Sequence, residues 1–233
     1  GGRDGAGLVA VGLKDGKTIW KATDEHASYS SPTRARIGGG ERAVFFTRLS
    51  AMLIDPANGH VDAQIPFGQR GPTVNAATPL VAGDALFLTA SYSIGARMLR
   101  VSPDGFEEIW SSDDVLSSQY NTPVYADGRL YGIHGREDVG VAALRCVEAA
   151  TGKVRWSVDD FGVAHVLLAG DKLLLAKIDG QLVLAQASPE KFQPLARHAA
   201  FDGTLRAIPA LSGGKLLARD DNELKCIDVS AGP

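Results

Sequence analysis

Nine polar side chains are the strongest candidates for binding chemistry in this sequence. They are arginines, histidines, tyrosines and asparagines, which offer charged and neutral hydrogen-bond donors to a polar or anionic ligand. Each lies in or beside a short polar segment between β-prone runs, and binding residues are often found in loops on a rigid scaffold. The alternative is that these residues have no binding role and are simply polar loop residues exposed to water. The nine are Arg48, Asn75, Tyr92, Tyr120, Asn121, His134, Arg136, His165 and Arg206.

Metal and thiol chemistry has weaker support. No two of the five histidines have the spacing of metal ligands, and the run Asp220, Asp221 and Glu223 leaves a calcium site open as an alternative to an ordinary turn. Cys146 and Cys226 occupy equivalent positions of a repeat, too far apart for a disulfide, so we expect two buried free thiols. The sequence therefore identifies no catalytic residue and predicts no metal site.

A repeated unit must position these residues. The segments LVAVGLKDGKTIW (8–20), MLRVSPDGFEEIW (98–110) and LRCVEAATGKVRW (144–156) each join an apolar run, a polar turn and a second β-prone run. Copies recur about every 40–47 residues, with turn glycines at Gly16, Gly59, Gly105 and Gly152. All three tryptophans of the chain, Trp20, Trp110 and Trp156, follow the turn at one repeat position, which Ala63 and Leu195 take in two other copies.

The repeated residues have a structural interpretation. Glycine tolerates the positive φ of a tight turn between strands. A tryptophan at a fixed position after the turn offers a large flat surface, and we expect Trp20, Trp110 and Trp156 to pack between neighbouring repeats.

A second repeated unit completes each period. Segments such as ATPLVAGDALFL (77–88) and NTPVYADGRLYG (121–132) indicate strand, turn and strand. Four short strands per period, named A to D, without sustained helical periodicity, are typical of an all-β fold, the β-propeller. Strand A would line the channel and strand D the rim. The D-to-A and B-to-C loops would then share one face, the channel mouth, where the nine candidates lie; the segment from His134 to Gly140 is our first choice among these loops.

We expect a single propeller over residues 1–233. Whole blades are predicted at 27–66, 73–112, 118–160 and 163–199, with strands C and D of a first blade at 7–21 and strands A to C of a last blade at 204–229. Ring closure needs the D strand that the last blade lacks, because open strand edges are avoided in native folds. We therefore expect further N-terminal blades, completing a parent propeller of seven or eight blades.

The Ala-x-x-Gly-Lys-x-x-Trp core at residues 149–156 resembles the pyrroloquinoline-quinone-type (PQQ-like) repeat. The runs YSSPT, NAATPLV and YGIHGR are similar to bacterial PQQ-binding-like β-propeller repeat proteins. The resemblance implies a periplasmic or otherwise extracytoplasmic location. It also implies one of three functions: a module that binds a protein or a small polar ligand at the channel mouth, a PQQ-dependent alcohol or sugar dehydrogenase, or a scaffold for outer-membrane protein assembly.

The same resemblance bears on cofactors. Quinoprotein dehydrogenases with this repeat are expected to hold the quinone above two adjacent cysteines, beside a calcium ion. Cys146 and Cys226 are not adjacent, so we expect a non-enzymatic binding module and keep PQQ and calcium as the alternative.

Composition sets the outer limits. The chain has 233 residues, of which 45% are hydrophobic and 22% charged, with a formal net charge of −3. These values exclude a disordered chain and argue against a dedicated nucleic-acid binder, which would carry a basic surface. No apolar run approaches the roughly 18 residues of a membrane-spanning helix.

Overall fold

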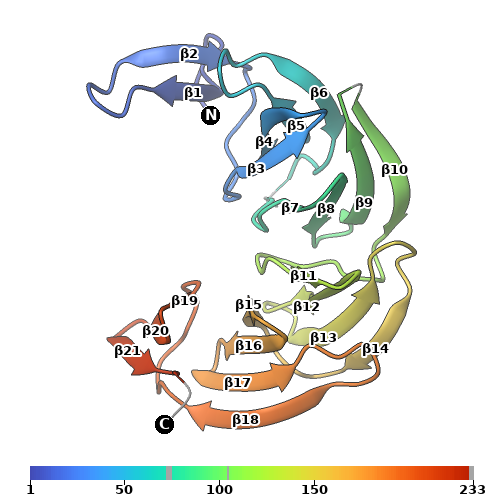
Figure 1. Cartoon of the computed structure of the whole chain (residues 1–233), viewed down its shortest axis with the longest axis vertical. Helices are drawn as coiled ribbons and strands as arrows, with labels where there is room; N and C mark the ends of the chain where they lie inside the picture. Colours follow the sequence, from blue (N-terminus) through green and yellow to red (C-terminus); the bar gives the residue numbers. More distant parts are fainter. Residues whose placement is uncertain (72–74, 104, 231–233) are drawn as a thin grey trace. The chain divides into compact units, whose positions relative to one another are not determined.

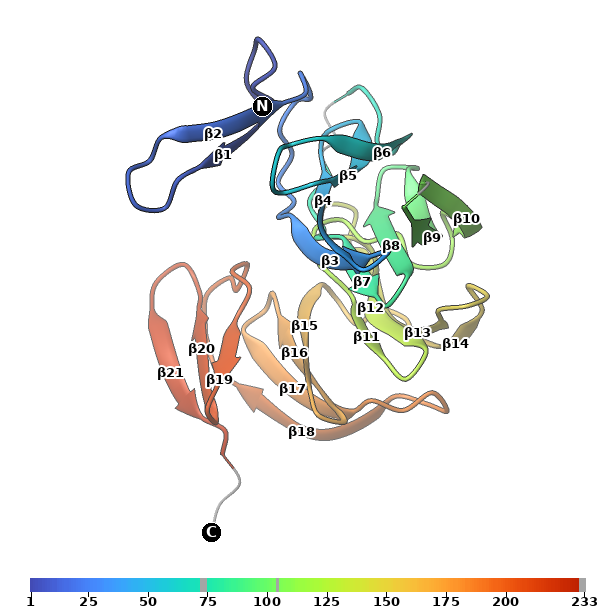
Figure 2. The ribbon, with the colours of Figure 1, turned by 45° about the horizontal axis from the view of Figure 1, so that its top comes forward.

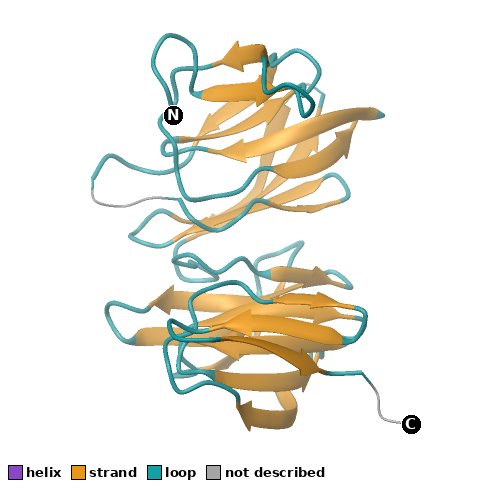
Figure 3. Ribbon diagram, turned by 90° about the vertical axis from the view of Figure 1, so that its left-hand side faces the viewer, coloured by secondary structure: helices purple, strands orange, loops and turns teal. Residues whose placement is uncertain are grey.

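The computed structural model describes residues 1–71, 75–103 and 105–230. Within these ranges every regular element is a β-strand and no helix occurs (Figure 3). The strands build antiparallel sheets in which neighbours follow chain order, as in propeller blades. Two compact units result: residues 1–122 with the turn at 148–153, and residues 123–147 with the chain from 154 onward.

The first unit holds three sheets (Figure 1). The first sheet is β1 (Leu8–Val11) and β2 (Thr18–Ala22); the second is β3 (Thr33–Ile37), β4 (Gly40–Phe46), β5 (Ser50–Ile54) and β6 (Val61–Pro66); the third is β7 (Leu80–Ala82), β8 (Ala85–Ala90), β9 (Gly95–Ser102) and β10 (Gly105–Ser112).

The second unit also holds three sheets. The fourth sheet is β11 (Val124–Ala126), β12 (Arg129–Arg136), β13 (Val141–Glu148) and β14 (Val154–Val158); the fifth is β15 (Ala164–Ala169), β16 (Lys172–Lys177), β17 (Gln181–Gln186) and β18 (Gln193–Ala199); the sixth is β19 (Ala210–Ser212), β20 (Lys215–Arg219) and β21 (Leu224–Asp228). The predicted all-β fold of four-stranded units is confirmed.

Turn and strand-start residues explain why the strands begin and end where they do. Pro32, Pro79, Pro123 and Pro209 each directly precede the first strand of a sheet, where a missing backbone N–H costs no ladder bond. The turn glycines Gly16, Gly59, Gly105 and Gly152 have φ values of +68°, +79°, +135° and +72°. Only glycine adopts such angles without strain.

The hydrophobic core lies between consecutive sheets. In the first unit, Val44 and Phe46 of β4 and Leu86 and Leu88 of β8 belong to one buried cluster between the second and third sheets. In the second unit, Leu182 of β17 belongs to a similar cluster that includes residues of the sixth sheet. Figure 2 shows the fifth and sixth sheets standing side by side. Within each unit, these sheets therefore bury apolar faces against a sheet that is next to them in the chain.

The last strand of each of the first five sheets carries a β-bulge at the same repeat position. The pairing register shifts by one residue in β2, β6, β10, β14 and β18, and the extra residue is, in order, Ile19, Asp62, Ile109, Arg155 and Leu195. A bulge re-aims the side chains next to it. The residue after each bulge occupies what we call the tryptophan slot, and the slot residues are Trp20, Ala63, Trp110, Trp156 and Ala196.

Each slot tryptophan contacts the turn between the third and fourth strands of the next sheet. The indole Nε1 donates a hydrogen bond to a turn carbonyl in all three cases: Trp20 to Pro56 (2.9 Å), Trp110 to Ala149 (2.7 Å) and Trp156 to Ser188 (2.8 Å). The indoles of Trp20 and Trp110 cover Gly59 and Gly152, where a Cβ atom would approach the ring to 2.6 and 2.9 Å. Glycine is thus required there by φ and by the tryptophan together.

The structure corrects the sequence alignment at Leu195. Ala196, not Leu195, pairs with Leu184 and fills the slot of the fifth sheet. Leu195 is the bulged residue and is 46% exposed. The error has a physical origin, because a shift of one residue reverses the face of a strand to which a side chain belongs.

The expectation of two buried thiols is wrong for Cys226. Cys146 is buried, whereas Cys226 is exposed. Cys226 pairs with Leu217, which is 46% exposed on the same face of the sixth sheet, while Leu216 on the opposite face is buried against the fifth sheet.

Candidate functional site

Loops at one end of each sheet bring the candidate residues into two groups, one in each unit. Because the strands are antiparallel, the connection to the next sheet and the loop between the second and third strands leave from the same end. Arg48, Asn75, Tyr92, Tyr120 and Asn121 belong to the first unit. His134, Arg136, His165 and Arg206 belong to the second.

Asn75 holds the loops of the second sheet together. Its side chain is fully buried, and Nδ2 donates to the carbonyls of Thr47 (2.8 Å) and Phe67 (3.0 Å). Its own carbonyl accepts the backbone N–H of Tyr29 at 3.1 Å and the hydroxyl of Ser28. Buried amides bonded in this way fix backbone positions. Asn75 is therefore a positioning residue for the loops rather than a surface that a ligand could contact.

A cationic hollow lies beside this anchor. His26, Arg48 and Arg70 line a cavity of about 560 Å³ together with Gly1, Ala27, Leu49 and Gly71. The backbone N–H of Arg48 donates to the His26 carbonyl at 3.1 Å, and its guanidinium donates to the Gly71 carbonyl. These bonds hold three loops together, with His26, Arg48 and Arg70 at their junction. We call this feature the cationic hollow.

Sequence reasoning selected Arg48 but missed His26 and Arg70. Both lie in connections between sheets, so their membership of the loop end was visible in the sequence. Their convergence on Arg48 depends on the loop hydrogen bonds, for which no sequence signal exists.

Tyr92, Tyr120 and Asn121 stand near one another around Gln119. Gln119 Nε2 lies 2.8 Å from the Tyr92 hydroxyl, and the Tyr92 carbonyl accepts from Gln69 at 2.9 Å. Tyr92 has φ of +66°, a conformation that costs about 1–3 kcal/mol in a non-glycine residue. Asn121 is 2% exposed, and its carbonyl accepts the Ser118 hydroxyl at 2.7 Å. These bonds make the loop end of the third sheet rigid.

In the second unit, His165 and Arg206 are in direct contact. His165 is 5% exposed, and its Nε2 lies 2.8 Å from the Arg206 carbonyl. Burial lowers the pKa of His165, outweighing the opposite effect of this hydrogen bond. The Arg206 guanidinium forms an ion pair with Glu137, with Nε and Oε2 3.4 Å apart. The second group therefore carries balanced rather than net positive charge.

Three residues expected in loops lie within strands. His134 and Arg136 belong to β12, and His165 belongs to β15. The strand extends past His134 because Gly135, with φ of +112°, has no Cβ atom, which would collide with the Val141 carbonyl across the ladder. Arg136 pairs with Asp138, with Nε and Oδ1 2.9 Å apart. The guanidinium predicted to receive an anion thus already has a carboxylate partner.

Comparison with known proteins identifies the family of this chain. Residues 2–158 match the family model described as outer membrane protein assembly factor BamB, which is more than half of the chain. The chain belongs to this BamB family of PQQ-like repeat proteins. No curated protein matches its sequence.

Solved structures similar to this BamB-family chain share its fold at low sequence identity. BamB from Moraxella catarrhalis is 14% identical, with a TM-score of 0.53, 93% of this chain and 76% of that chain covered. The computationally designed Ika8 protein is 10% identical, with a TM-score of 0.57, 91% of this chain and 74% of that one. The quinohemoprotein alcohol dehydrogenase from Comamonas testosteroni is 9% identical, with a TM-score of 0.63, 88% of this chain and 42% of that one.

The described residues do not fit a quinone and calcium site of the dehydrogenase type. Cys146 and Cys226 lie in different sheets, and burial raises the pKa of the Cys146 thiol. The Asp220 carboxylate accepts the backbone N–H groups of Glu223 (2.7 Å), Asn222 (2.8 Å) and Gly203 (2.9 Å), which lower its pKa. Asp220 therefore caps a turn. Among residues 1–71, 75–103 and 105–230, no three His, Cys, Asp or Glu side chains are grouped as metal ligands.

The described part of the chain contains no helix long and apolar enough to span a membrane.

Proposed function

We propose that this BamB-family chain is a non-catalytic binding module that acts outside the cytoplasm and holds a protein partner at its loop end. The family description, an assembly factor for outer membrane proteins, supports both the location and a protein as the partner. The rigid loops support the choice of surface, because binding residues concentrate on loops held by a scaffold.

The cationic hollow carries this proposal. Arg48 and Arg70 line one cavity, beside His26, on a chain whose formal net charge is −3, so two positive charges are concentrated there. Arginine side chains bind carboxylates with paired donors. The partner surface that matches this chemistry is an acidic segment with two or more neighbouring Asp or Glu residues.

The remaining candidates have two roles in this proposal. Asn75, Asn121 and His165 are buried and keep the loops in place. Tyr92, Tyr120, His134, Arg136 and Arg206 are partly or fully accessible and would offer further polar contacts around the loop end.

Calorimetry with a hexaglutamate peptide tests the proposal. The 233-residue chain should bind the peptide weakly and less tightly as salt rises, because exposed ion pairs are screened. Arg48→Ala and Arg70→Ala should each weaken binding about 3–10-fold. Arg34→Ala is the matched control, because Arg34 is an exposed arginine of the same unit that pairs with Glu41; its affinity should be unchanged.

Two results would contradict the proposal. One is binding that Arg34→Ala weakens as much as Arg48→Ala does. The other is a stoichiometric absorption change of the chain with PQQ and calcium chloride, which would instead favour the quinoprotein alternative.

A further inference from the structure

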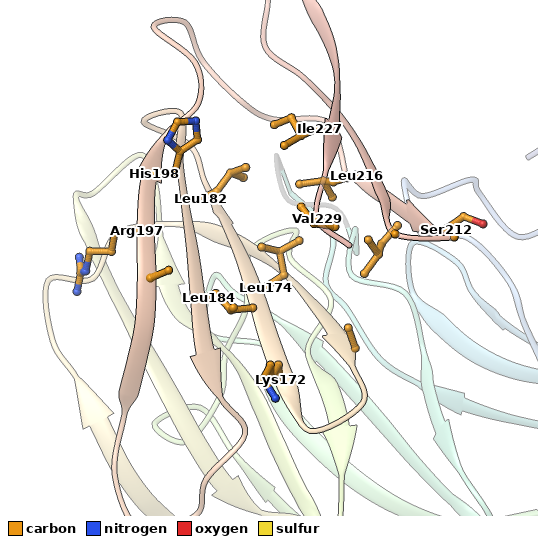
Figure 4. Close-up of a pocket in the computed structure, with 15 residues that line it drawn as sticks. Lys172, Leu174, Leu182, Leu184, Arg197, His198, Ser212, Leu216, Ile227 and Val229 are labelled. Carbon is orange, nitrogen blue, oxygen red and sulfur yellow. The ribbon is translucent and has the colours of Figure 1, made fainter. Parts of the chain in front are cut away.

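The tryptophan slot of the fifth sheet opens on a cavity. Its residue, Ala196, removes the indole that fills this position in the first, third and fourth sheets. A cavity of about 620 Å³ lies there, between the fifth and sixth sheets (Figure 4). This volume is within the range of about 300–1,000 Å³ typical of small-molecule sites. We call it the slot cavity.

The walls of the slot cavity are apolar. Figure 4 shows Leu174, Leu182 and Leu184 of the fifth sheet facing Leu216, Ile227 and Val229 of the sixth. No Phe, Tyr or Trp is among the described residues that line it, whereas Trp156 of the fourth sheet packs on Phe192 with ring centroids 6.0 Å apart. The slot cavity is therefore apolar enough to accommodate an aromatic ring, and no aromatic ring of Phe, Tyr or Trp lies among its described lining residues.

The position that accepts the indole N–H hydrogen bond in the other sheets has an equivalent beside the slot cavity. In the other sheets the indole N–H donates to a carbonyl just beyond the third strand of the next sheet, at Pro56, Ala149 or Ser188. Val229 follows β21, three residues before Gly232, as Ala149 stands three residues before Gly152. Val229 also lines the slot cavity. An N–H group on a bound ring would thus meet the repeat position that accepts such a bond elsewhere in the chain.

Ala63, the other small slot residue, lies beside a packed core. Ala63 and Phe106 of the next sheet pack on the same buried cluster in the first unit. Phe106 is an aromatic residue of the neighbouring third sheet, so that cluster has an aromatic side chain at its edge. A small slot residue can therefore lie beside a packed interface, as Ala63 does, whereas Ala196 lines a cavity.

We propose that the slot cavity binds a small flat aromatic N–H heterocycle of the indole class. The bound ring would take the place of the slot tryptophan, stacking between leucines of the two sheets with its N–H directed to the Val229 position. Lys172 and His198 at the margin would favour an indole that carries a carboxylate. This site is independent of the cationic hollow, which belongs to the first unit.

Binding of indole itself, followed by calorimetry and by the NMR signals of labelled leucine methyl groups, tests this inference. Wild-type protein should show saturable binding, with shifts at Leu174, Leu184 and Leu216. Naphthalene, which matches the shape without the N–H, should bind at least about threefold more weakly. Absence of saturable binding, or shifts confined to other leucines, would overturn the inference.

Substitution at the slot provides the matched comparison. Ala196→Trp restores the repeat tryptophan and should reduce indole affinity at least tenfold. Leu195→Trp places the same side chain on the adjacent bulged residue, which is 46% exposed, and should leave affinity unchanged. Should Ala196→Trp not fold, Ala196→Leu fills part of the cavity and should weaken binding several-fold. Equal affinity in wild type and a folded slot variant would overturn the site.

A final arm distinguishes a free ligand from a partner's side chain. N-acetyl-tryptophanamide presents the same ring on a blocked backbone. Weaker binding than indole supports a small free ligand. Tighter binding than that of indole would contradict a small free ligand and would indicate that the slot cavity receives a tryptophan side chain of another protein.

Discussion

Trp156 Nε1 donates a 2.8 Å hydrogen bond to the carbonyl of Ser188, 32 residues further along the chain. The indole also packs between Tyr131 of its own sheet and Phe192 of the next, with centroid distances of 6.1 and 6.0 Å. One side chain thereby joins two consecutive sheets through a directed bond and two aromatic contacts. Trp20 and Trp110 make the same bond to their next sheets.

Trp156→Ala should lower the free energy of unfolding by about 3 kcal/mol, since it leaves a cavity and an unpaired carbonyl between two sheets. Trp156→Phe should lower the free energy of unfolding less than Trp156→Ala does, because an aromatic ring remains in contact with both neighbours. Loss of the hydrogen bond should account for about 1 kcal/mol of that decrease, and the smaller ring for the rest. Urea denaturation of both variants measures these values. Equal losses in the two variants would show that the aromatic contacts contribute nothing, since both variants lack the hydrogen bond and only phenylalanine keeps a ring.

Gly152→Ala should destabilise the protein more than Gly16→Ala. Both glycines have φ near +70°, so alanine introduces the same backbone strain of about 1 kcal/mol at either position. A Cβ at Gly152 would also lie 2.9 Å from the Trp110 indole, whereas a Cβ at Gly16 meets nothing within 4 Å. Thermal unfolding of the pair isolates the tryptophan contact. Equal shifts in Tm would mean that the indole moves aside freely.

The turn glycines and tryptophans are also where sequence reasoning was most successful. Their spacing along the chain is local information, and it predicted four short strands per period without any knowledge of contacts. The fifth sheet shows where this reasoning fails, because the sequence alignment placed Leu195 in the slot that Ala196 occupies. The bulge is a property of pairing between β17 and β18. Ala63 could be placed correctly because Gly59 marks its turn, but in the fifth sheet neither a turn glycine nor a tryptophan marks the register.

The site was less predictable for a similar reason. Loop membership identified Arg48 and Asn75, but they have different roles. Asn75 is fully buried and its Nδ2 is bonded to backbone carbonyls, whereas Arg48 borders the cationic hollow. Arg136 looked like an open guanidinium because nothing in the sequence shows that Asp138, two residues away, turns back onto it.

Cys226 should react with Ellman's reagent in the native protein, and Cys146 should not. Cys226 is exposed. Cys146 is fully buried, and burial raises the pKa of its thiol and so suppresses the thiolate that would react. We expect one thiol equivalent to be released rapidly at pH 8 and the second only in denaturant. Cys226→Ser should abolish the rapid phase; its persistence in that variant would show that Cys146 becomes accessible in the native state.

Stability should fall between pH 7.5 and pH 5.5 because of His165. Burial lowers the pKa of His165 in the folded state, so as pH falls through about 6.5 the unfolded chain gains a proton first. Folding is then penalised, and the penalty grows until the folded-state pKa is passed. Asp171 and Asp228, with pKa values of about 2, act only at lower pH.

His165→Gln keeps a side-chain N–H that can donate to the Arg206 carbonyl and removes the titration. Its unfolding free energy, measured in urea, should vary less across this pH range than that of the wild type. The same slope in both proteins would place the pH dependence in another group.

Hydrogen–deuterium exchange with and without the hexaglutamate peptide tests the central claim, that binding occurs at the loop end through the cationic hollow. We expect slower exchange in segments 23–32, 47–49 and 67–71 when the peptide is present. The turns at 55–60 and 148–153, at the opposite end of the strands, should not change. Protection of those turns with no change in the loop segments would contradict the account.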